Sequence, residues 1–339
     1  MTNANATKPR QASIEDWTPS QRVSGAFSIS NAQLGRTRND KPYLRCLVGD
    51  RTGEVPGRMW SIDEQTYERL PAEGFVWLEG ETQAYQGELQ IIIQAIDPIE
   101  PTPEQLRDLL PCSTHDPAEM FARVVAILET LAHPAIKALA GAYLSDDLLM
   151  DAFRVCPAAK RMHHAYLGGL LEHTLSLLRL GDRVCGLYPK INRDLVLMGL
   201  FTHDMGKTRE LSYDKGFSYT DRGELVGHIV EGAMILRDKA DQVMRQSGIR
   251  MPPGAVMVLE HIILSHHGVP EYGAAKIPST PEAILVSMLD NLDAKTTIAL
   301  CAARPDRPSA NLRGNFTERQ WALDTKLYRP DPLDGATEG

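Results

Sequence analysis

HHAYLGGLLEHT (residues 163–174) and FTHDMGK (residues 201–207) decide how the second half of this chain folds. The first segment opens an amphipathic helix, because its leucines recur at helical spacing and bury one face. These leucines are Leu167, Leu170, Leu171, Leu175 and Leu178. His173 therefore lies beside a stripe that faces the core.

The second segment ends an apolar helix. The run LVLMGLF stops at His203-Asp204, and Gly206 predicts a left-handed turn past the helix end. One helix terminus thus presents an imidazole and a carboxylate, with Lys207 one turn after His203 as a nearby cation. Taken alone, such a pair is more often part of a packed core than of a site.

Three downstream segments change that interpretation. His228 in ELVGHIVEG, the pair His266-His267 in ILSHHG and Asp290 in VSMLDNLDAK all lie in or at the end of apolar helical stretches. An unpaired ionisable group is costly there, so a shared metal site explains these side chains better than separate accidents do. Five imidazoles and two carboxylates without a thiolate favour Mn, Fe, Co, Ni or Zn over a structural Cys-type zinc site.

The order H…HD…H…HH…D over residues 157–303 resembles the HD superfamily of metal-dependent phosphohydrolases. The resemblance implies two divalent transition-metal ions, with Mn favoured. One ion would be held by His173, His203, Asp204 and Asp290. The other would be held by His228, His266 and His267, with Asp204 bridging the two.

Length and composition indicate a multidomain globular chain. The 339 residues allow about two domains at roughly 150 residues each. No apolar run approaches the ~18 residues of a membrane helix, and the N-terminus lacks an apolar signal core, so we expect a cytoplasmic protein without a membrane partner. Five scattered cysteines without CxxC spacing indicate core residues in a reducing compartment.

Residues 1–18 are polar and are expected to be disordered, whereas residues 19–100 alternate like short strands with one inserted helix. In the strand around residues 43–48, Leu44, Cys46 and Val48 point to one side. Five short strands predict a small closed β-barrel. The segments KPYLRCLVGDRTGEVPGRMW and VWLEGETQAYQGELQ resemble the OB-fold nucleic-acid module.

This resemblance implies binding of single-stranded RNA or DNA by base stacking and phosphate contacts. The candidate binding residues are Tyr43, Arg45, Arg58 and Trp60. They lie in or near a basic stretch, residues 36–58, of a chain whose formal net charge is −8. A solvated strand surface remains the alternative for the cations, and a place in the barrel core remains the alternative for the tryptophan.

Residues 101–303 lack alternating strand patterns, so we expect an all-α HD domain. It begins with a capping box at Thr102 and Gln105. Residues 304–339 are expected to form a C-terminal helix, from about Thr317 to Tyr328, and a tail. The sequence leaves association into a homo-oligomer open.

An OB barrel followed by an HD domain, with the strings HHAYLGGLLEHT, GHIVEG and LSHHGVPEYG, resembles the YhaM-type 3′-to-5′ exoribonucleases. The resemblance implies hydrolysis of single-stranded RNA, with DNA as a second substrate, to nucleoside 5′-monophosphates. Asp204, Lys207 and His164 are the candidate catalytic residues. Lys207 would stabilise phosphoryl oxygens, and His164 would contact the phosphate or donate a proton. Asp293, one turn after Asp290, could hold a ligand in place.

Two other functional classes stay open. A cyclic-dinucleotide or nucleotide phosphohydrolase would use the same metal centre, but the Gly-Tyr-Pro segment typical of the cyclic-dinucleotide branch is missing after HHG. The barrel also favours a polymer over a small ligand. A catalytically inert nucleic-acid-binding adaptor is disfavoured, because every expected ligand position is present.

Overall fold

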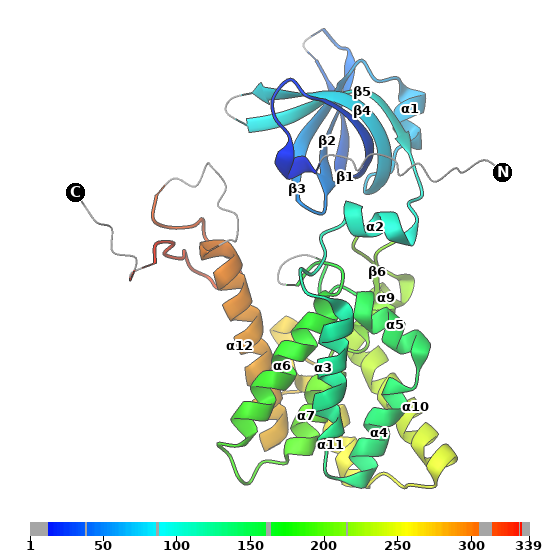
Figure 1. The fold of residues 1–339 in the computed structure, drawn as a ribbon, viewed down its shortest axis with the longest axis vertical. Coiled ribbons are helices and arrows are strands. Elements are labelled where there is room, and N and C mark those ends of the chain that lie inside the picture. Colours follow the sequence, from blue (N-terminus) through cyan, green and yellow to red (C-terminus); the bar gives the residue numbers. More distant parts are fainter. Residues whose placement is uncertain are drawn as a thin grey trace, which may run out of the picture. The chain divides into compact units, whose positions relative to one another are not determined.

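The computed structural model describes residues 13–37, 39–85, 88–160, 164–214, 216–304, 314–331 and 333. These residues form two compact units. The first holds the described residues up to Thr114 together with Ser212–Ser218, and the second holds His115–Leu211 and the described residues from Tyr219 onward. The predicted β-barrel followed by a helical domain is confirmed (Figure 1).

The first unit is built on a closed barrel of five strands in the order β1-β2-β3-β5-β4. The strands are β1 (Arg22–Arg36), β2 (Pro42–Asp50), β3 (Gly53–Trp60), β4 (Gly74–Tyr85) and β5 (Glu88–Pro98). All neighbouring pairs are antiparallel except β3 and β5, which are parallel. Leu44, Cys46 and Val48 are buried as the alternation predicted.

Local sequence sets the corners of the barrel. The Asp50 carboxylate accepts hydrogen bonds from the amides of Thr52 and Gly53 at 2.7 and 3.2 Å, which forms the turn between β2 and β3. The inserted helix α1 (Glu64–Arg69) is capped by Asp63. The predicted hairpin turn at residues 86–87 lies outside the described residues, although Tyr85 pairs with Glu88 on either side of it.

Two predicted boundaries of the first domain are wrong. Residues 13–18 are not a disordered tail: the short helix η1 (Ile14–Asp16) buries Ile14, and Trp17 packs edge-on against Phe27 at 5.3 Å. At the other end the unit continues past residue 100. Helix α2 (Pro103–Leu109) packs on β1 and β2, and the Arg51 amide donates to the carbonyl of Asp108.

Helices make up most of the second unit. They are α3 (Pro117–Glu129), α4 (Pro134–Leu144), α5 (Asp147–Val155), α6 (Gly169–Cys185), α7 (Arg193–Thr202), α8 (Lys207–Glu210), α9 (Asp221–Leu225), α10 (Gly227–Ser247), α11 (Pro253–Ser265), η2 (Pro270–Tyr272) and α12 (Pro281–Ala303). Side-chain caps fix several starts, as Asp116, Asn192 and Thr280 do. A short pair of strands, β6 (Leu211–Ser212) and β7 (Ser218–Tyr219), interrupts the helices and was not predicted.

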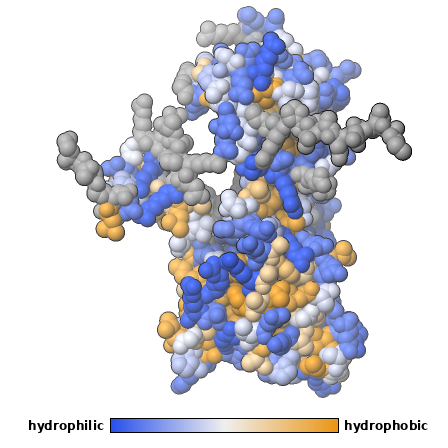
Figure 2. Space-filling view, in the orientation of Figure 1, coloured by the Kyte–Doolittle hydropathy of each residue, from blue (hydrophilic) through white to orange (hydrophobic). Residues whose placement is uncertain are grey.

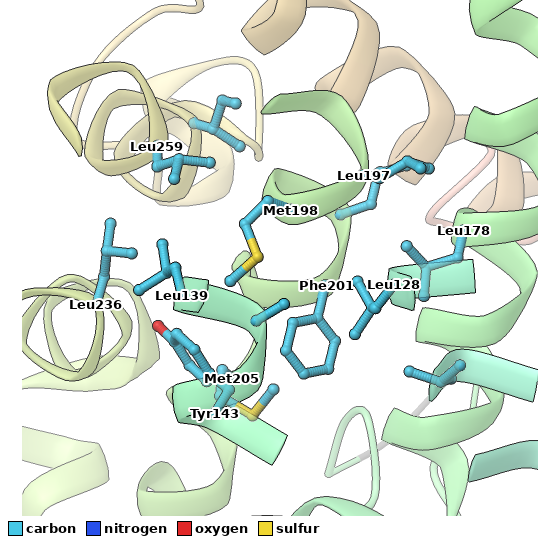
Figure 3. Packing of buried hydrophobic residues seen from close by; sticks show 14 of the residues in the cluster. Leu128, Leu139, Tyr143, Leu178, Leu197, Met198, Phe201, Met205, Leu236 and Leu259 are labelled. Atoms are coloured by element: carbon cyan, nitrogen blue, oxygen red, sulfur yellow. The ribbon is translucent and has the colours of Figure 1, made fainter. Parts of the chain in front are cut away.

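Helix α7 is the centre of the second unit. Its run from Val196 to Thr202 is buried on every side, because α4, α6, α11 and α12 all pack against it. Figure 3 shows Leu197, Met198 and Phe201 of this helix within the core. A helix that is apolar all round belongs in such a position. The C-terminal end of α7 therefore places His203 and Asp204 deep inside the unit.

Gly206 has a different role from the predicted one. Its φ is −63°, so no left-handed turn is required there. A Cβ at this position would lie 2.0 Å from the carbonyl oxygen of His228. Glycine therefore allows the segment after α7 to approach the start of α10, which brings His228 close to Asp204.

The predicted C-terminal helix is also wrong. Described residues 314–331 contain no helix and instead form turns with two isolated bridges, Phe316 with Tyr328 and Gln320 with Thr325. Asp324 has a φ of 54°, which interrupts any helix through this segment.

The surface of the helical unit is mixed in character. Hydrophobic residues lie scattered among hydrophilic ones on the face in view (Figure 2). No helix of the described residues combines the length and apolar character needed to cross a bilayer.

Candidate metal centre

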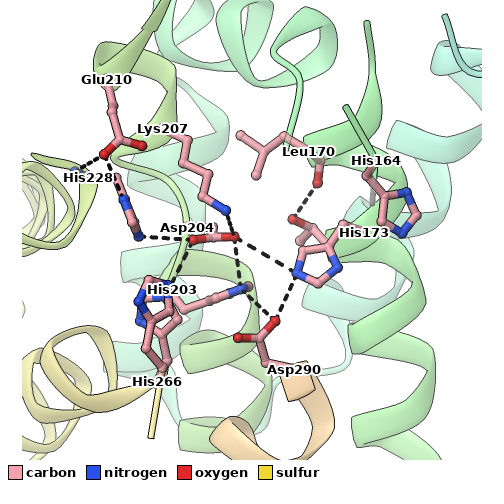
Figure 4. A network of polar contacts seen from close by, with 12 residues as sticks. His164, Leu170, His173, His203, Asp204, Lys207, Glu210, His228, His266 and Asp290 are labelled. Atoms are coloured by element: carbon pink, nitrogen blue, oxygen red, sulfur yellow. Dashed lines mark hydrogen bonds and ion pairs between the residues drawn. The ribbon is translucent and has the colours of Figure 1, made fainter. Parts of the chain in front are cut away.

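The Asp204 carboxylate lies at the centre of the cluster of predicted ligands (Figure 4). Its two oxygens face different groups of imidazoles, which come from the ends or interiors of several helices. Oδ2 faces the side of α6 and α12, and Oδ1 faces the side of α10 and α11. One carboxylate is thus shared by two sets of possible ligands.

The first group surrounds Oδ2 of Asp204. His203 Nε2 lies 3.4 Å from this oxygen and His173 Nε2 lies 3.9 Å from it. Asp290 Oδ1 completes the group, 3.2 Å from His173 Nε2 and 4.0 Å from His203 Nε2. Four donors from α6, α7 with its C-terminal end, and α12 therefore converge on one point.

The second group surrounds Oδ1 of Asp204. His228 Nε2, at the start of α10, lies 3.6 Å from this oxygen, and His266 Nε2, just after α11, lies 3.5 Å from it. The ring of His267 lies beside both, with centroids 4.2 Å from His266 and 5.2 Å from His228. One ligand atom from each of these four residues lies within 4.8 Å of every other.

All five imidazoles use their Nδ1 atom for a hydrogen bond that leaves Nε2 directed inward. The acceptors are Asp293 for His173, the Leu200 carbonyl for His203, Glu210 for His228, the Ile263 carbonyl for His266 and the Tyr272 carbonyl for His267, at 2.7–2.9 Å. A carbonyl or carboxylate there holds the proton on Nδ1 and leaves the Nε2 lone pair available.

The inward-facing atoms lack the hydrogen bonds that buried polar atoms normally have. Nε2 of His203, His228 and His266 and Oδ1 of Asp204 are buried without a hydrogen-bond partner among the described residues. Unsatisfied buried nitrogens cost free energy unless a ligand takes their lone pairs. The donor set therefore fits divalent metal ions.

The pKa shifts of four ligands, His266, His267, Asp204 and Asp290, agree with this use. Burial lowers the pKa of His267 to about 3, and burial likewise lowers the pKa of His266. Burial alone would raise the pKa of Asp204, but Lys207 and His203 hold it well below its usual range. Asp290 is held low in the same way by His173. Neutral imidazoles and ionised carboxylates are the forms that bind cations.

Lys207 and His164 occupy different positions. Lys207 Nζ lies 2.7 Å from Asp204 Oδ2, and Lys207 lines a cavity next to the second group. His164 is buried behind His173: its Nδ1 meets the Tyr166 hydroxyl at 2.7 Å, and its Nε2 lies 3.5 Å from Asp293 Oδ2. This position favours orientation of Asp293 over the predicted contact with substrate.

Two carboxylates, one predicted and one not, hold metal ligands in orientation. Asp293 accepts from His173 at 2.9 Å and from Ser176, which fits the predicted ligand-holding role. Glu210 was missed: its Oε1 accepts from both the amide and Nδ1 of His228, each at 2.9 Å. Glu210 lies 18 residues before His228, in the polar string KTRE, so no spacing rule connects the two.

The four candidate nucleic-acid residues lie together on the β2–β3 face of the barrel. Tyr43 is paired with Trp60 and Arg45 with Arg58 in the antiparallel register. The Tyr43 and Trp60 rings are 5.2 Å apart, and the Arg58 guanidinium lies 5.6 Å from the centroid of Tyr85. Trp60 is 47% exposed, so it belongs to the outer surface and not to the core.

Comparison with known proteins gives a consistent picture. Residues 170–295 match the HD domain family. The chain is 32% identical to a 3′-5′ exoribonuclease YhaM of Shouchella clausii (strain KSM-K16), over 91% of this chain and 94% of that protein. It is 30% identical to the 3′-5′ exoribonuclease YhaM of Oceanobacillus iheyensis, over 93% of this chain and 96% of that protein.

A solved structure, the second OB-fold domain of replication protein A from Methanococcus maripaludis, aligns with 27% of this chain and 96% of its own length. Its TM-score of 0.21 and identity of 16% are too low to bear on fold or function.

Proposed function

Because the chain belongs to the family of YhaM 3′-5′ exoribonucleases, a family of hydrolytic nucleases, we propose that it degrades single-stranded RNA from the 3′ end and releases nucleoside 5′-monophosphates. The observation that carries the proposal is the convergence of four Nε2 atoms on the two oxygens of Asp204, with His267 beside them. An acceptor fixes the Nδ1 atom of each of the five imidazoles.

Two divalent ions fit this arrangement. His173, His203, Asp204 and Asp290 would hold one, and His228, His266, His267 and Asp204 would hold the other. Mn²⁺ is the first choice, with Fe, Co, Ni and Zn also compatible with nitrogen and oxygen donors. Such ions supply water activation near neutral pH and neutralise charge during phosphodiester hydrolysis.

The reaction requires only positioning from the chain itself. Water adds to the phosphorus of the last linkage, the bond to the 3′-oxygen of the preceding nucleotide breaks, and that oxygen takes a proton. Burial lowers the pKa of the Lys207 ammonium, but Asp204, 2.7 Å away, outweighs burial and raises that pKa, so Lys207 stays charged. It would stabilise the phosphoryl oxygens of a bound substrate. Asp293 and Glu210 hold two of the imidazoles in orientation.

The barrel binds the single-stranded polymer. The exposed ring of Trp60 and the half-buried ring of Tyr43 beside it can stack on unpaired bases, while Arg45 and Arg58 lie on the same face to meet phosphates. RNA is the preferred polymer in this proposal, and single-stranded DNA is the second substrate.

The test is digestion of labelled strands with Mn²⁺. A 5′-labelled single-stranded RNA should shorten in single-nucleotide steps, and a strand blocked at its 3′ end should persist. Single-stranded DNA and a cyclic dinucleotide serve as competing substrates. Rapid cleavage of a circular RNA, or turnover of the cyclic dinucleotide alone, would assign the enzyme to another class.

A further inference from the structure

A cavity of about 520 Å³ opens next to the second group of proposed metal ligands. Its lining comes entirely from the helical unit and consists of Ala158, Ala159, Lys160, Lys207, Glu210, Leu211, Tyr219, His228 and His267. Volumes of roughly 300–1,000 Å³ are usual for small-ligand sites, and this one suits a single nucleotide better than a run of them.

The cavity leads to one side of the metal centre. His228 and His267 line it, whereas the side chains of His173 and His203 are at most 2% exposed. A phosphate that enters through the cavity therefore meets the second group and the shared Asp204 first.

The lining is chemically divided. Lys160 and Lys207 contribute two cations, and the single carboxylate, Glu210, already accepts two hydrogen bonds from His228. Leu211 and Tyr219 also line the cavity and offer an aliphatic and an aromatic surface. Cations beside metal ligands suit a phosphate, and an apolar wall with an aromatic ring suits a nucleobase.

Hydrogen bonds of the next residue fix the backbone at Tyr219, whereas the Tyr219 ring is partly exposed to solvent. The next residue, Thr220, donates its amide to the Glu210 carbonyl at 2.9 Å and its hydroxyl to the Arg209 carbonyl at 2.7 Å. The Tyr219 side chain is nevertheless 45% exposed, and no hydrogen bond or ring contact of this side chain occurs within the described parts of the chain. A fixed backbone and an uncovered ring make a ready stacking surface.

From these observations we infer that the cavity holds the 3′-terminal nucleotide, with its base stacked on Tyr219 and its 5′-phosphate between Lys207 and the second group of ligands. The inference rests on the proposed function, because it names the subsite of that same reaction. Tyr219 is a binding residue for the base and takes no part in the proton transfers. A single-nucleotide cavity also explains why release would proceed one residue at a time.

The test measures binding and does not require turnover. Calorimetric titration of the full-length, Mn²⁺-loaded protein with AMP reports both base and phosphate, and titration with ribose 5-phosphate reports the phosphate and sugar alone. Tyr219→Ala should raise the Kd for AMP roughly 5- to 140-fold, the range expected for one base stack. The Kd for ribose 5-phosphate should not change, and Tyr219→Phe should bind AMP like the parent. Tyr188→Ala, which removes an exposed tyrosine outside the cavity lining, is the matched control.

Two outcomes would overturn the inference. If Tyr219→Ala leaves AMP binding unchanged, the base lies elsewhere. If the variant weakens AMP and ribose 5-phosphate by the same factor, Tyr219 shapes the cavity without contacting the base. Either result can occur while the parent still digests RNA from the 3′ end, so failure here is distinct from failure of the proposed function.

Discussion

Asp204 illustrates how one residue can determine two binding groups. Its oxygens face separate sets of imidazoles, so its negative charge serves both. Asp204→Asn keeps the shape but removes that charge. Turnover of RNA should fall by at least about 100-fold, as expected when a central electrostatic contact is lost. Metal analysis should show fewer than two ions per chain, whereas RNA affinity measured by fluorescence anisotropy should be retained.

The matched control for this variant is Asp182→Asn, which removes a carboxylate that pairs with Arg193 at the surface. It should keep full turnover and metal content. A fully active Asp204→Asn protein would contradict the shared role of this residue.

A substitution of Glu210 tests whether the hydrogen bond that orients His228 contributes to metal binding. Glu210→Gln keeps an acceptor for His228 but removes the charge that favours its Nδ1 proton. We expect the Mn²⁺ concentration for half-maximal activity to rise about 10- to 100-fold, with activity recovering at high Mn²⁺. A Mn²⁺ titration of turnover measures this. Glu260→Gln, at a surface ion pair with Arg237, should leave the titration unchanged, and an unaltered Glu210→Gln curve would refute the orienting role.

His173 should make metal binding depend on pH. Burial lowers its pKa, but Asp290 and Asp293 outweigh burial and raise the pKa of His173 to about 9 in the metal-free protein. The raised pKa stabilises the metal-free fold fully below the unfolded value of about 6.5, and this contribution is lost as pH rises through about 9. Metal must displace this proton, so affinity should rise with pH up to about 9.

Calorimetry in two buffers with different ionisation enthalpies measures the protons released. About one proton per chain should be released on Mn²⁺ binding near pH 7.5, and almost none above pH 9.5. His266 and His267 should add none, because their pKa values are already lowered. Equal proton release at both pH values would show that His173 is neutral before metal arrives.

At the scale of elements, helix α7 shows what a sequence pattern can predict. An apolar run that ends in His-Asp indicated a buried helix with ligands at its terminus, and the structure has that helix at the centre of its unit. The predicted C-terminal helix failed because an isolated helix of about 12 residues is marginal in water. There the Thr317 hydroxyl accepts the amide of Leu327, which supports a turn-rich loop instead.

Local sequence patterns do not predict contacts between residues that are distant in the chain. The close approach of Gly206 to the His228 carbonyl depends on tertiary packing. From the sequence alone, a glycine after an apolar helix predicts a turn instead. Glu210 was missed for the same reason, since its partner lies on another helix. Ile14 and Trp17 were assigned to a polar tail because two isolated apolar residues give no period.

The β2–β3 face offers the test of the barrel as an element. Trp60 pairs with Tyr43 and has an exposed ring, so Trp60→Ala should weaken binding of a single-stranded RNA by about 1–3 kcal/mol. Binding is best measured in the Asp204→Asn background, which prevents digestion. Trp321→Ala removes an exposed tryptophan of the C-terminal segment and should have no effect. Equal losses in both variants would argue against a specific stacking role for Trp60.

At the scale of the whole molecule, the acidic net charge and the local basic face have opposite consequences. The chain carries a formal charge of −8, which disfavours non-specific binding of RNA over the whole surface. Arg45 and Arg58 face each other in the register of β2 and β3 and concentrate positive charge on one face. Binding of long RNA should therefore depend on salt through a few phosphate contacts.

RNA binding by the barrel should depend on salt concentration more steeply than binding at the metal centre. Each phosphate contact on a single strand contributes about 0.7 to the slope of log Kd against log salt, so Arg45→Gln with Arg58→Gln should reduce that slope by about 1.4 for a long RNA. A dinucleotide, which in our proposal occupies the cavity of the helical unit alone, should show a shallow slope that this double variant leaves unchanged. Arg237→Gln with Arg319→Gln removes the same charge from surface ion pairs and is the control. If the double barrel variant changes the slope for the dinucleotide as much as for the long RNA, these arginines act through the overall field or the fold, and the barrel does not provide the grip on the strand.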